Sequence, residues 1–186
     1  MKGKVVKAAM NDSREMYVVL DRKIPGSVRG LENVVVENVS WTPEVKITGN
    51  RFSRIPTRGV LLFTRKKSLI ENNIFYGMHM SAISITDDTM NWFESGPVHD
   101  LTIRNNTFID CGSPVIYIDA EYTTFDGPVQ KNITIEENVF ESSDPNVKGL
   151  YARGVDGLVI RNNFIRLKSG KFIDKIIDCE NVTMGE

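Results

Sequence analysis

The chain has 186 residues, enough for one domain with a sizeable core, and its apolar fraction of 41% is ordinary for a globular protein. Its 23 Lys and Arg residues almost balance its 24 Asp and Glu residues, and no long block carries one sign. This balance argues against a nucleic-acid-binding surface and against a polybasic membrane patch. No apolar run near the start is long enough for a signal peptide or a membrane span. The chain as given is therefore expected to be cytoplasmic, or to be a piece of a longer protein whose signal is missing.

The two cysteines and two histidines do not indicate a metal or redox centre. Cys111 and Cys179 are too few for a disulfide framework and are interpreted as small buried side chains. His79 and His99 have no partner at a spacing typical of a metal site or a nucleophilic pair. We therefore expect no metal and no cofactor.

The first forty residues lack the regularity of the rest of the chain. Residues 16–21 (MYVVLD) and 34–39 (VVVENV) are rich in β-branched side chains and are predicted to be strands, with a turn region at Pro25 and Gly26 between them. We expect a single domain over residues 1–186, in which residues 1–40 form an irregular first coil or a cap and residues 41–186 form regular coils.

From residue 41 onward, a short alternating pattern with a central asparagine occurs five times. A second alternating segment follows each copy and is looser after the last. The first segments are VKITGNRF at 45–52, SLIENNIF at 68–75, LTIRNNTF at 101–108, ITIEENVF at 133–140 and LVIRNNFI at 158–165, and the second begin at Gly59, Ser81, Pro114, Gly149 and Lys175. The shared asparagines are Asn50, Asn73, Asn106, Asn138 and Asn163, at intervals of 23, 33, 32 and 25 residues. The base period therefore lies in the low twenties.

Such a period, with short β-branched segments and no helical periodicity, predicts an all-β fold: a right-handed parallel β-helix of about five to seven coils. A leucine-rich repeat would need a recurring leucine frame that these segments lack. Equivalent positions of neighbouring coils should stack about 4.8 Å apart. We therefore expect an asparagine ladder, and an internal aromatic stack of Phe52, Phe75, Phe108 and Phe140.

Two neighbouring coils carry inserts at one corner. If the second segments are aligned on Phe63, Ile85 and Ile118, the next ladder asparagine follows after 10, 21 and 20 residues. The extra residues are DDTMNWFESGP at 87–97 and AEYTTFDGPVQ at 120–130. Long loops that leave adjacent coils at one corner stand side by side, and loops on a rigid scaffold commonly carry function. The candidate site is therefore a groove at this corner.

Three acidic side chains at this corner are candidates for catalysis. Since strand side chains alternate in direction, Asp88 and Glu121 should lie on the outer surface of neighbouring coils, while Asp87 falls in the inward phase with a perturbed pKa. The carboxyl groups of Asp88 and Glu121 could then be about 5 to 9.5 Å apart, the range that glycosidases use. A solvated turn is the alternative interpretation of these acids.

Four further residues are candidates for substrate binding. Trp92 lies in a polar loop, where a flat aromatic face suits the apolar face of a sugar ring, although packing onto the next coil is equally compatible with the sequence. Glu94 belongs to the same loop, and Arg65 and Arg153 are expected near the same corner, where they could bind a hydroxyl or a carboxylate.

The residues just described are similar to a known family. The run NRFSRIPTRGVLLFTRKKSLIENNIF at 50–75, followed by SAISITDD, NWFESGPV and DLTIRNNTF, resembles the C-terminal coils of the β-helical α-1,3-galactosidases, over residues 40–166. The resemblance implies inverting hydrolysis of terminal α-linked galactose without a cofactor. It also implies that Asp87 and Asp88 are the acid and base candidates, that Glu121 assists, and that the partner is a galactose-terminated glycan. Members of that family are usually secreted or periplasmic.

Two other functional classes remain compatible with the sequence. In a polysaccharide lyase, Asp87, Asp88 and Glu121 would hold Ca²⁺, and Arg153 or a lysine would act on an acidic sugar. In a non-catalytic module, the same corner would bind glycan or assemble with a partner chain. Because a β-helix ends in open strand edges, we also expect the chain to form a homo-oligomer.

Overall fold

The structure is a computed structural model that describes residues 2–28, 37–88, 96–121 and 125–185. Its residues form two compact units, Met1–Val34 and Val35–Glu186.

The first unit contains a β-hairpin. Strands β1 (Val5–Met10) and β2 (Met16–Leu20) pair antiparallel, and a single 3₁₀ turn, η1 (Gly26–Val28), follows. Asn11 closes the hairpin loop, since its Oδ1 accepts hydrogen bonds from the Ser13 hydroxyl and the Glu15 backbone N–H, each at 2.8 Å. An antiparallel pair is not a coil of a parallel β-helix, and the role of this segment as a cap stays a prediction.

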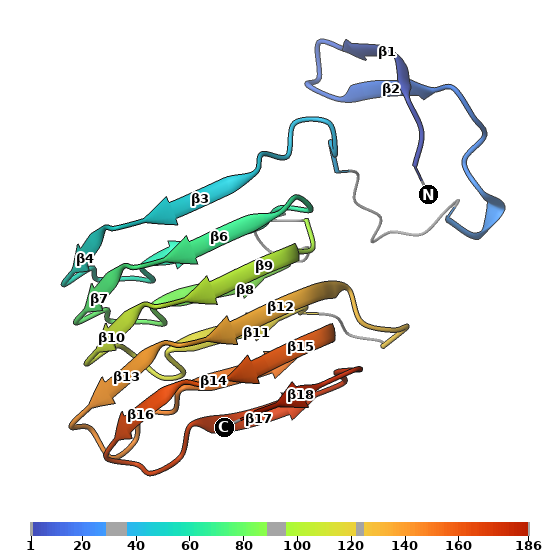
Figure 1. Ribbon diagram of the computed structural model, residues 1–186. Coiled ribbons are helices and arrows are strands. Elements are labelled where there is room, and N and C mark those ends of the chain that lie inside the picture. Colours follow the sequence, from blue (N-terminus) through green and yellow to red (C-terminus); the bar gives the residue numbers. More distant parts are fainter. Residues whose placement is uncertain (1, 29–36, 89–95, 122–124, 186) are drawn as a thin grey trace. The chain divides into compact units, whose positions relative to one another are not determined.

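The second unit is the expected right-handed parallel β-helix (Figure 1). Each of five coils contributes one strand to each of three parallel sheets, and β18 adds a sixth strand to the first sheet alone. The first sheet contains β3 (Val45–Thr48), β6 (Ser68–Glu71), β9 (His99–Arg104), β12 (Gln130–Glu136), β15 (Val155–Arg161) and β18 (Thr183–Met184). The second contains β4 (Arg51–Ser53), β7 (Ile74–Tyr76), β10 (Thr107–Ile109), β13 (Val139–Ser142) and β16 (Phe164–Leu167). The third contains β5 (Val60–Leu61), β8 (Ile83–Thr86), β11 (Ile116–Asp119), β14 (Leu150–Arg153) and β17 (Ile173–Ile177).

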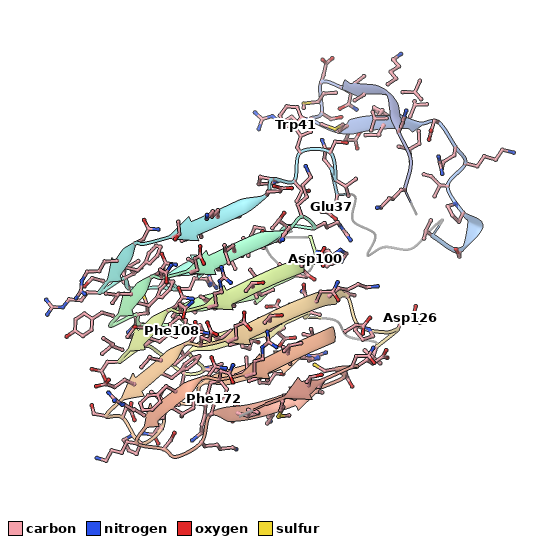
Figure 2. The ribbon with its side chains drawn as sticks, in the orientation of Figure 1. Glu37, Trp41, Asp100, Phe108, Asp126 and Phe172 are labelled. Atoms are coloured by element: carbon pink, nitrogen blue, oxygen red, sulfur yellow. The ribbon has the colours of Figure 1, made fainter. Side chains whose placement is uncertain are left out.

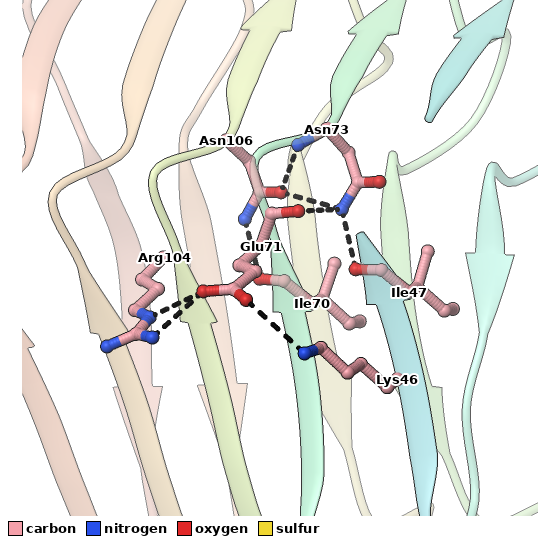
Figure 3. Close-up of polar contacts among 7 residues, drawn as sticks. All are labelled: Lys46, Ile47, Ile70, Glu71, Asn73, Arg104 and Asn106. Atoms are coloured by element: carbon pink, nitrogen blue, oxygen red, sulfur yellow. Dashed lines mark hydrogen bonds and ion pairs between the residues drawn. The ribbon is translucent and has the colours of Figure 1, made fainter. Parts of the chain in front are cut away.

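The asparagine ladder lies at the corner between the first and second sheets. Each repeated segment bends there, because the residue before the ladder asparagine has a left-handed backbone, as at Asn72 (φ 56°) and Asn105 (φ 51°). The amide oxygen of Asn106 accepts bonds at 3.0 Å from both the backbone N–H and the side-chain amide of Asn73. The side-chain amide of Asn106 in turn donates to the Ile70 carbonyl at 2.9 Å (Figure 3). The predicted ladder is thus confirmed, and it fixes the register of successive coils.

The aromatic stack is also confirmed. The ring centroids of Phe52, Phe75, Phe108 and Phe140 follow each other at 4.7, 5.2 and 4.9 Å. Phe172 continues the row at 4.8 Å with its ring turned edge-on, although it comes from the loop before β17 (Figure 2). Repetition did not predict this fifth ring, because Ile165 takes the equivalent position in β16 and is 37% exposed.

The outer face of the first sheet carries charged side chains of alternating sign. Glu71 pairs with Arg104 at 2.9 Å and with Lys46 at 4.0 Å, as Figure 3 shows, and Arg161 pairs with Glu136 at 2.7 Å. These pairs are partly exposed, so each contributes little to stability on its own. Because the signs alternate, no two like charges stand next to each other on neighbouring strands of this sheet.

One alignment of the third sheet was wrong by one residue. The register pairs Val60 with Ile83 and Leu61 with Ser84, so Leu62, and not Phe63, aligns with Ile85. Leu62 belongs to the buried core, whereas Phe63 is half-buried outside it. The run VLLF is apolar on both faces, so alternation could not decide which leucine or phenylalanine points inward. In this register, Arg65 takes the position next to Asp88.

Within the ranges that the structure describes, no helix has the length and apolar character needed to cross a membrane.

Candidate functional site

The two inserts leave neighbouring coils at one corner, as expected. Residues 87–98 connect β8 to β9 and residues 120–129 connect β11 to β12, whereas Gly154 alone separates β14 from β15. Since β8 pairs with β11 and β9 pairs with β12, both connections span the same corner between the third and first sheets. We name this region, built from the described parts of both connections and the strand ends beside them, the insert corner.

Asp87 is the buried acid of the insert corner, with 6% of its surface exposed. Its Oδ2 accepts a hydrogen bond of 2.9 Å from the side-chain amide of Gln130. The side-chain oxygen Oε1 of Gln130 accepts a hydrogen bond from the backbone N–H of Val98. Because a backbone N–H can only donate, this contact fixes the orientation of the amide, and its NH₂ group must face Asp87. Gln130 thereby connects the beginning and the end of the first insert.

The other oxygen of Asp87, Oδ1, is buried and has no hydrogen-bond partner among the described residues. Burial is the main reason that the pKa of Asp87 rises from 3.8 to about 7. The positive charge of Arg65 and the Gln130 bond oppose this rise, while the negative charges of Glu37 and Glu121 add to it. Near neutral pH much of Asp87 is therefore protonated, and since Oδ2 is occupied as an acceptor, the proton belongs on Oδ1.

Arg65 lies in the insert corner, where the sequence placed it, and forms an ion pair with Glu37. The guanidinium Nε and the Glu37 carboxylate are 2.6 Å apart, and both side chains are mostly buried. The same carboxylate lies 3.1 Å from the position that a Cβ of Gly96 would occupy, and Gly96 has φ 136°. Glu37 was not anticipated, because it precedes the first repeat and belongs to no repeated position.

Asp88 and Glu121 lie at the ends of the neighbouring strands β8 and β11. Asp88 is 8% exposed, so the expected outer-surface carboxylate is largely enclosed. Glu121 has a left-handed backbone (φ 42°), which the Asp119 carboxylate stabilises by accepting from the Glu121 backbone N–H at 3.0 Å. The predicted separation of the Asp88 and Glu121 carboxyl groups stays a prediction.

Asp119 is the centre of a second polar cluster beside Glu121. Its Oδ2 accepts from the Tyr117 hydroxyl at 2.8 Å, and its Oδ1 lies 3.6 Å from the Arg153 guanidinium. Burial and this hydrogen bond to a carboxylate both raise the pKa of Tyr117, which keeps the phenol protonated. The rings of Tyr117 and Tyr151 lie 5.2 Å apart on neighbouring strands. Arg153 therefore lies near the insert corner, as expected, with Asp119 as a described partner.

Besides Glu37, three of these residues were not among the sequence candidates for a role in the site. Gln130 ends the second insert but has a polar side chain that is fully buried, and its bond to Asp87 joins residues 43 positions apart. Asp119 and Tyr117 occupy outward positions of an otherwise regular strand. Two predicted binding residues, Trp92 and Glu94, lie outside the described residues.

No cluster of metal ligands was found in the described ranges. Among these residues, no three His, Cys, Asp or Glu side chains are arranged so that they could hold a metal ion. His99 adjoins the corner, where burial and the charge of Arg65 lower its pKa.

One cavity, of about 440 Å³, lies away from the insert corner. It is lined by Arg54, Ile55, Pro56, Gly77, Met78, His79 and Asp110. It contains one acidic side chain and none of the residues that surround Asp87. The acidic side chains around Asp87 therefore favour the insert corner over this cavity as the candidate site.

This fold and this corner define a right-handed parallel β-helix protein with an acidic site framed by loops. In agreement, residues 32–127 match the family described as right handed beta helix region.

Three relatives give a closer comparison. The whole chain is 49% identical to an α-1,3-galactosidase A of Bacteroides thetaiotaomicron, over 34% of that protein. An α-1,3-galactosidase A of Peterkaempfera griseoplana is 46% identical over 81% of this chain and 21% of its own length. An α-1,3-galactosidase B of Bacteroides fragilis is 34% identical over 86% of this chain and 29% of its own length.

The chain belongs to the right-handed β-helix family and corresponds to the β-helix region of the α-1,3-galactosidases. The resemblance inferred from the sequence is confirmed, and similarity reaches beyond residues 40–166 to the full chain. The chain spans about a third or less of the length of these relatives.

Proposed function

We propose that the insert corner binds a terminal α-linked galactose and hydrolyses its glycosidic bond with inversion at the anomeric carbon. The observation that carries this proposal is the environment of Asp87, where burial raises the pKa of the carboxyl group to about 7 beside other acidic side chains. The names of the relatives support galactose in α-1,3 linkage as the sugar to test first.

Asp87 acts as the general acid in this proposal. A glycosidase acid must carry its proton at working pH and release it to the departing sugar oxygen, and a pKa of about 7 fits both requirements. The Gln130 amide occupies Oδ2 and thereby directs the proton to Oδ1. Because Oδ1 is buried, proton transfer to a sugar oxygen requires a rearrangement of the corner on binding.

Asp88 acts as the general base that activates water. β8 ends at Thr86, and in this proposal its alternation continues through the next two residues, so that the carboxyl groups of Asp87 and Asp88 diverge. Divergence suits an inverting mechanism, in which a water molecule must fit between the base and the sugar and the two carboxyl groups are about 6.5 to 9.5 Å apart. Glu121 contributes contacts to substrate hydroxyls, and Arg65, held by Glu37, keeps the charge of the corner partly balanced.

Hydrolysis of galactosyl-α-1,3-galactose by the purified chain tests this proposal. Proton NMR should show the β anomer of free galactose first, because the reaction inverts the configuration. Asp87→Asn and Asp88→Asn should each lower kcat/KM by about 10² to 10⁴, the usual contribution of a general acid or base. Asp12→Asn, at an exposed position of the hairpin loop, should leave the rate unchanged.

The pH profile of the wild-type chain tests the role of Asp87. The rate should fall as the pH rises above about 7, since Asp87 then loses its proton.

Two outcomes would contradict the proposal. Near-normal turnover in either Asp→Asn variant would refute the catalytic assignment. Binding of the disaccharide without any turnover by the wild-type chain would instead assign the corner to a non-catalytic glycan-binding module.

A further inference from the structure

The cavity of about 440 Å³ lies at the corner between the second and third sheets, which we name the cavity corner. Its lining comes from the connections that follow β4, β7 and β10, three strands that lie next to one another in the second sheet (Figure 1). The insert corner lies between the third and first sheets. The cavity corner is therefore a separate place on the coil, and its lining shares no residue with the insert corner.

A glycine between two charged residues forms the floor of this cavity. The register of β4, β7 and β10 makes Arg54, Gly77 and Asp110 equivalent positions of three successive coils. All three have a left-handed backbone, with φ of 52°, 65° and 47°. Neighbouring strands are about 4.8 Å apart, so the backbones of Arg54 and Asp110 are separated by roughly 9.6 Å. Because Gly77 has no side chain, the space between the cation and the acid stays open.

The cationic end of the cavity carries concentrated positive charge. The guanidinium carbon of Arg54 lies 5.8 Å from the centroid of the Tyr76 ring, and that of Arg51 lies 5.7 Å from the same centroid. Within the described ranges, neither arginine forms an ion pair. A ligand carboxylate would relieve the repulsion between the two guanidinium groups and could accept two parallel N–H bonds from one of them.

The acidic end of the cavity is fixed by the next coil. Oδ1 of Asp110 accepts hydrogen bonds from the Ser143 backbone N–H at 3.3 Å and from the Ser142 hydroxyl at 3.4 Å. Among the described residues, no donor bonds to Oδ2, which can therefore accept from a ligand hydroxyl. A bare anion would meet the negative charge of Asp110 without such a bond. The two ends together favour a ligand that carries both a carboxylate and hydroxyl groups.

The size and the walls of the cavity suit one sugar unit. Small-molecule pockets have volumes of about 300 to 1,000 Å³, so this cavity is near the lower end of that range. Ile55, Pro56 and Met78 form the apolar part of the lining, against which the C–H groups of a pyranose ring can pack. A free amino acid is too short to reach both ends, because its carboxylate and ammonium are attached to one carbon by bonds of about 1.5 Å.

We propose that the cavity corner binds a sugar acid, a pyranose that carries a carboxylate. The carboxylate pairs with Arg54, a ring hydroxyl donates to Asp110, and the ring lies over Gly77. The described lining contains a single carboxyl group, whereas glycoside hydrolysis commonly uses two, so this site binds its ligand without cleaving it. The site is independent of the function proposed for the insert corner.

Binding of two matched sugars tests this site. Methyl α-galacturonide differs from methyl α-galactoside only in that a carboxylate replaces the CH₂OH group, and both are titrated by NMR into the purified chain. We expect Arg54→Gln to weaken binding of the galacturonide about tenfold and to leave any binding of the galactoside unchanged. Arg166→Gln removes an exposed guanidinium from β16, at the other end of the same sheet, and should change neither affinity.

A second variant distinguishes a sugar acid from a bare anion, for which sodium sulfate is the probe. Asp110→Gly keeps the left-handed backbone without strain and removes the acceptor. It should weaken binding of the galacturonide about threefold, whereas binding of sulfate should stay the same or increase, since a repelling charge is lost. Arg54 and Asp110 are both exposed, and thermal unfolding checks that each variant folds.

The possible outcomes separate this site from the proposed hydrolase. The sugar-acid site is refuted if the galacturonide does not bind, if Arg54→Gln binds it as tightly as wild type, or if Asp110→Gly leaves its affinity unchanged. Hydrolysis of galactosyl-α-1,3-galactose should proceed at the same rate in wild type and Arg54→Gln. A wild-type chain that binds the galacturonide through Arg54 and cleaves no disaccharide would support the cavity corner and overturn the hydrolase.

Discussion

Two corners of the coil differ in whether their buried polar side chains have hydrogen-bond partners. The ladder corner lies between the first and second sheets, and the insert corner lies between the third and first sheets. At the ladder corner Asn106 is 1% exposed, and both its amide oxygen and its amide nitrogen form hydrogen bonds with neighbouring coils. At the insert corner Asp87 is 6% exposed, and one of its oxygens has no partner among the described residues. The hydrogen bonds of the ladder corner stabilise the stack of coils. Burial at the insert corner instead disfavours the charged form of the Asp87 carboxyl group and favours its protonated form.

This difference follows from repetition. A side chain that recurs in every coil meets an identical neighbour above and below, so its hydrogen bonds are completed by the same residue type. A side chain that occurs in one coil only depends on whatever residue lies nearby, as Asp87 depends on Gln130. A buried polar group without a hydrogen-bond partner lowers the stability of the fold, and such groups occur mainly where they serve a function.

The largest expected effect concerns the core of the ladder corner. Phe108→Ala removes a ring that is stacked on both sides and should lower the free energy of unfolding by about 3 to 5 kcal/mol. Phe164→Ala is the matched control, since this ring is 54% exposed and contacts the Arg166 guanidinium from outside the stack, and it should cost less than about 1 kcal/mol. Urea unfolding measures both, and equal losses would contradict the internal stack.

The ladder itself should show the next largest effect. Asn106→Ala leaves the Ile70 carbonyl and the Asn73 N–H without their partners inside the protein, so we expect a loss of about 2 to 4 kcal/mol. Asn50→Ala removes the exposed end of the same ladder and should cost less than about 1 kcal/mol. If both variants unfold at the same urea concentration, the buried ladder does not carry the stability that we assign to it.

The insert corner should respond to pH in the direction set by the raised pKa of Asp87. The unfolded chain has the ordinary value near 3.8, so the protonated carboxyl stabilises the fold fully below that pH, and this contribution is lost as the pH rises through about 7. Asparagine resembles the protonated acid and does not titrate. Asp87→Asn should therefore gain stability relative to wild type by about 2 to 3 kcal/mol between pH 5 and pH 8.

Urea unfolding of both proteins at the two pH values measures this change. Asp12→Asn, which replaces an exposed aspartate, should show no such dependence. A constant difference between Asp87→Asn and wild type across this pH range would show that Asp87 titrates normally.

The repeated features could be predicted from the sequence because each copy supports the others. Five asparagines at related spacings indicate a ladder even if one spacing is misjudged, and the phenylalanines two residues later indicate the stack. The alignment error at Leu62 arose where the pattern lost its alternation and four apolar residues followed one another. Phe172 was missed because it reaches the stack from a loop.

The unique features of the site could be predicted only in part. Asp87, Asp88 and Glu121 could be predicted as site residues because they are acids that interrupt a regular segment. Gln130 and Glu37 carry no such signal, because their importance comes from contacts with residues far away in sequence, Asp87 for Gln130 and Arg65 for Glu37. Pairwise contacts of this kind leave no periodic signal in a single chain.

The ladder also bears on how such a protein can change over evolutionary time. Each asparagine bonds to its counterpart in the next coil, whether the two are 23 or 33 positions apart in the sequence. Register is therefore set at one corner and is independent of the length of chain at the opposite corner. Residues can be inserted into or deleted from the connections after β8 and β11 while the sheets keep their pairing. A scaffold of this kind lets new binding specificities arise through changes in loop length alone, and it offers the same freedom to anyone who exchanges these loops by design.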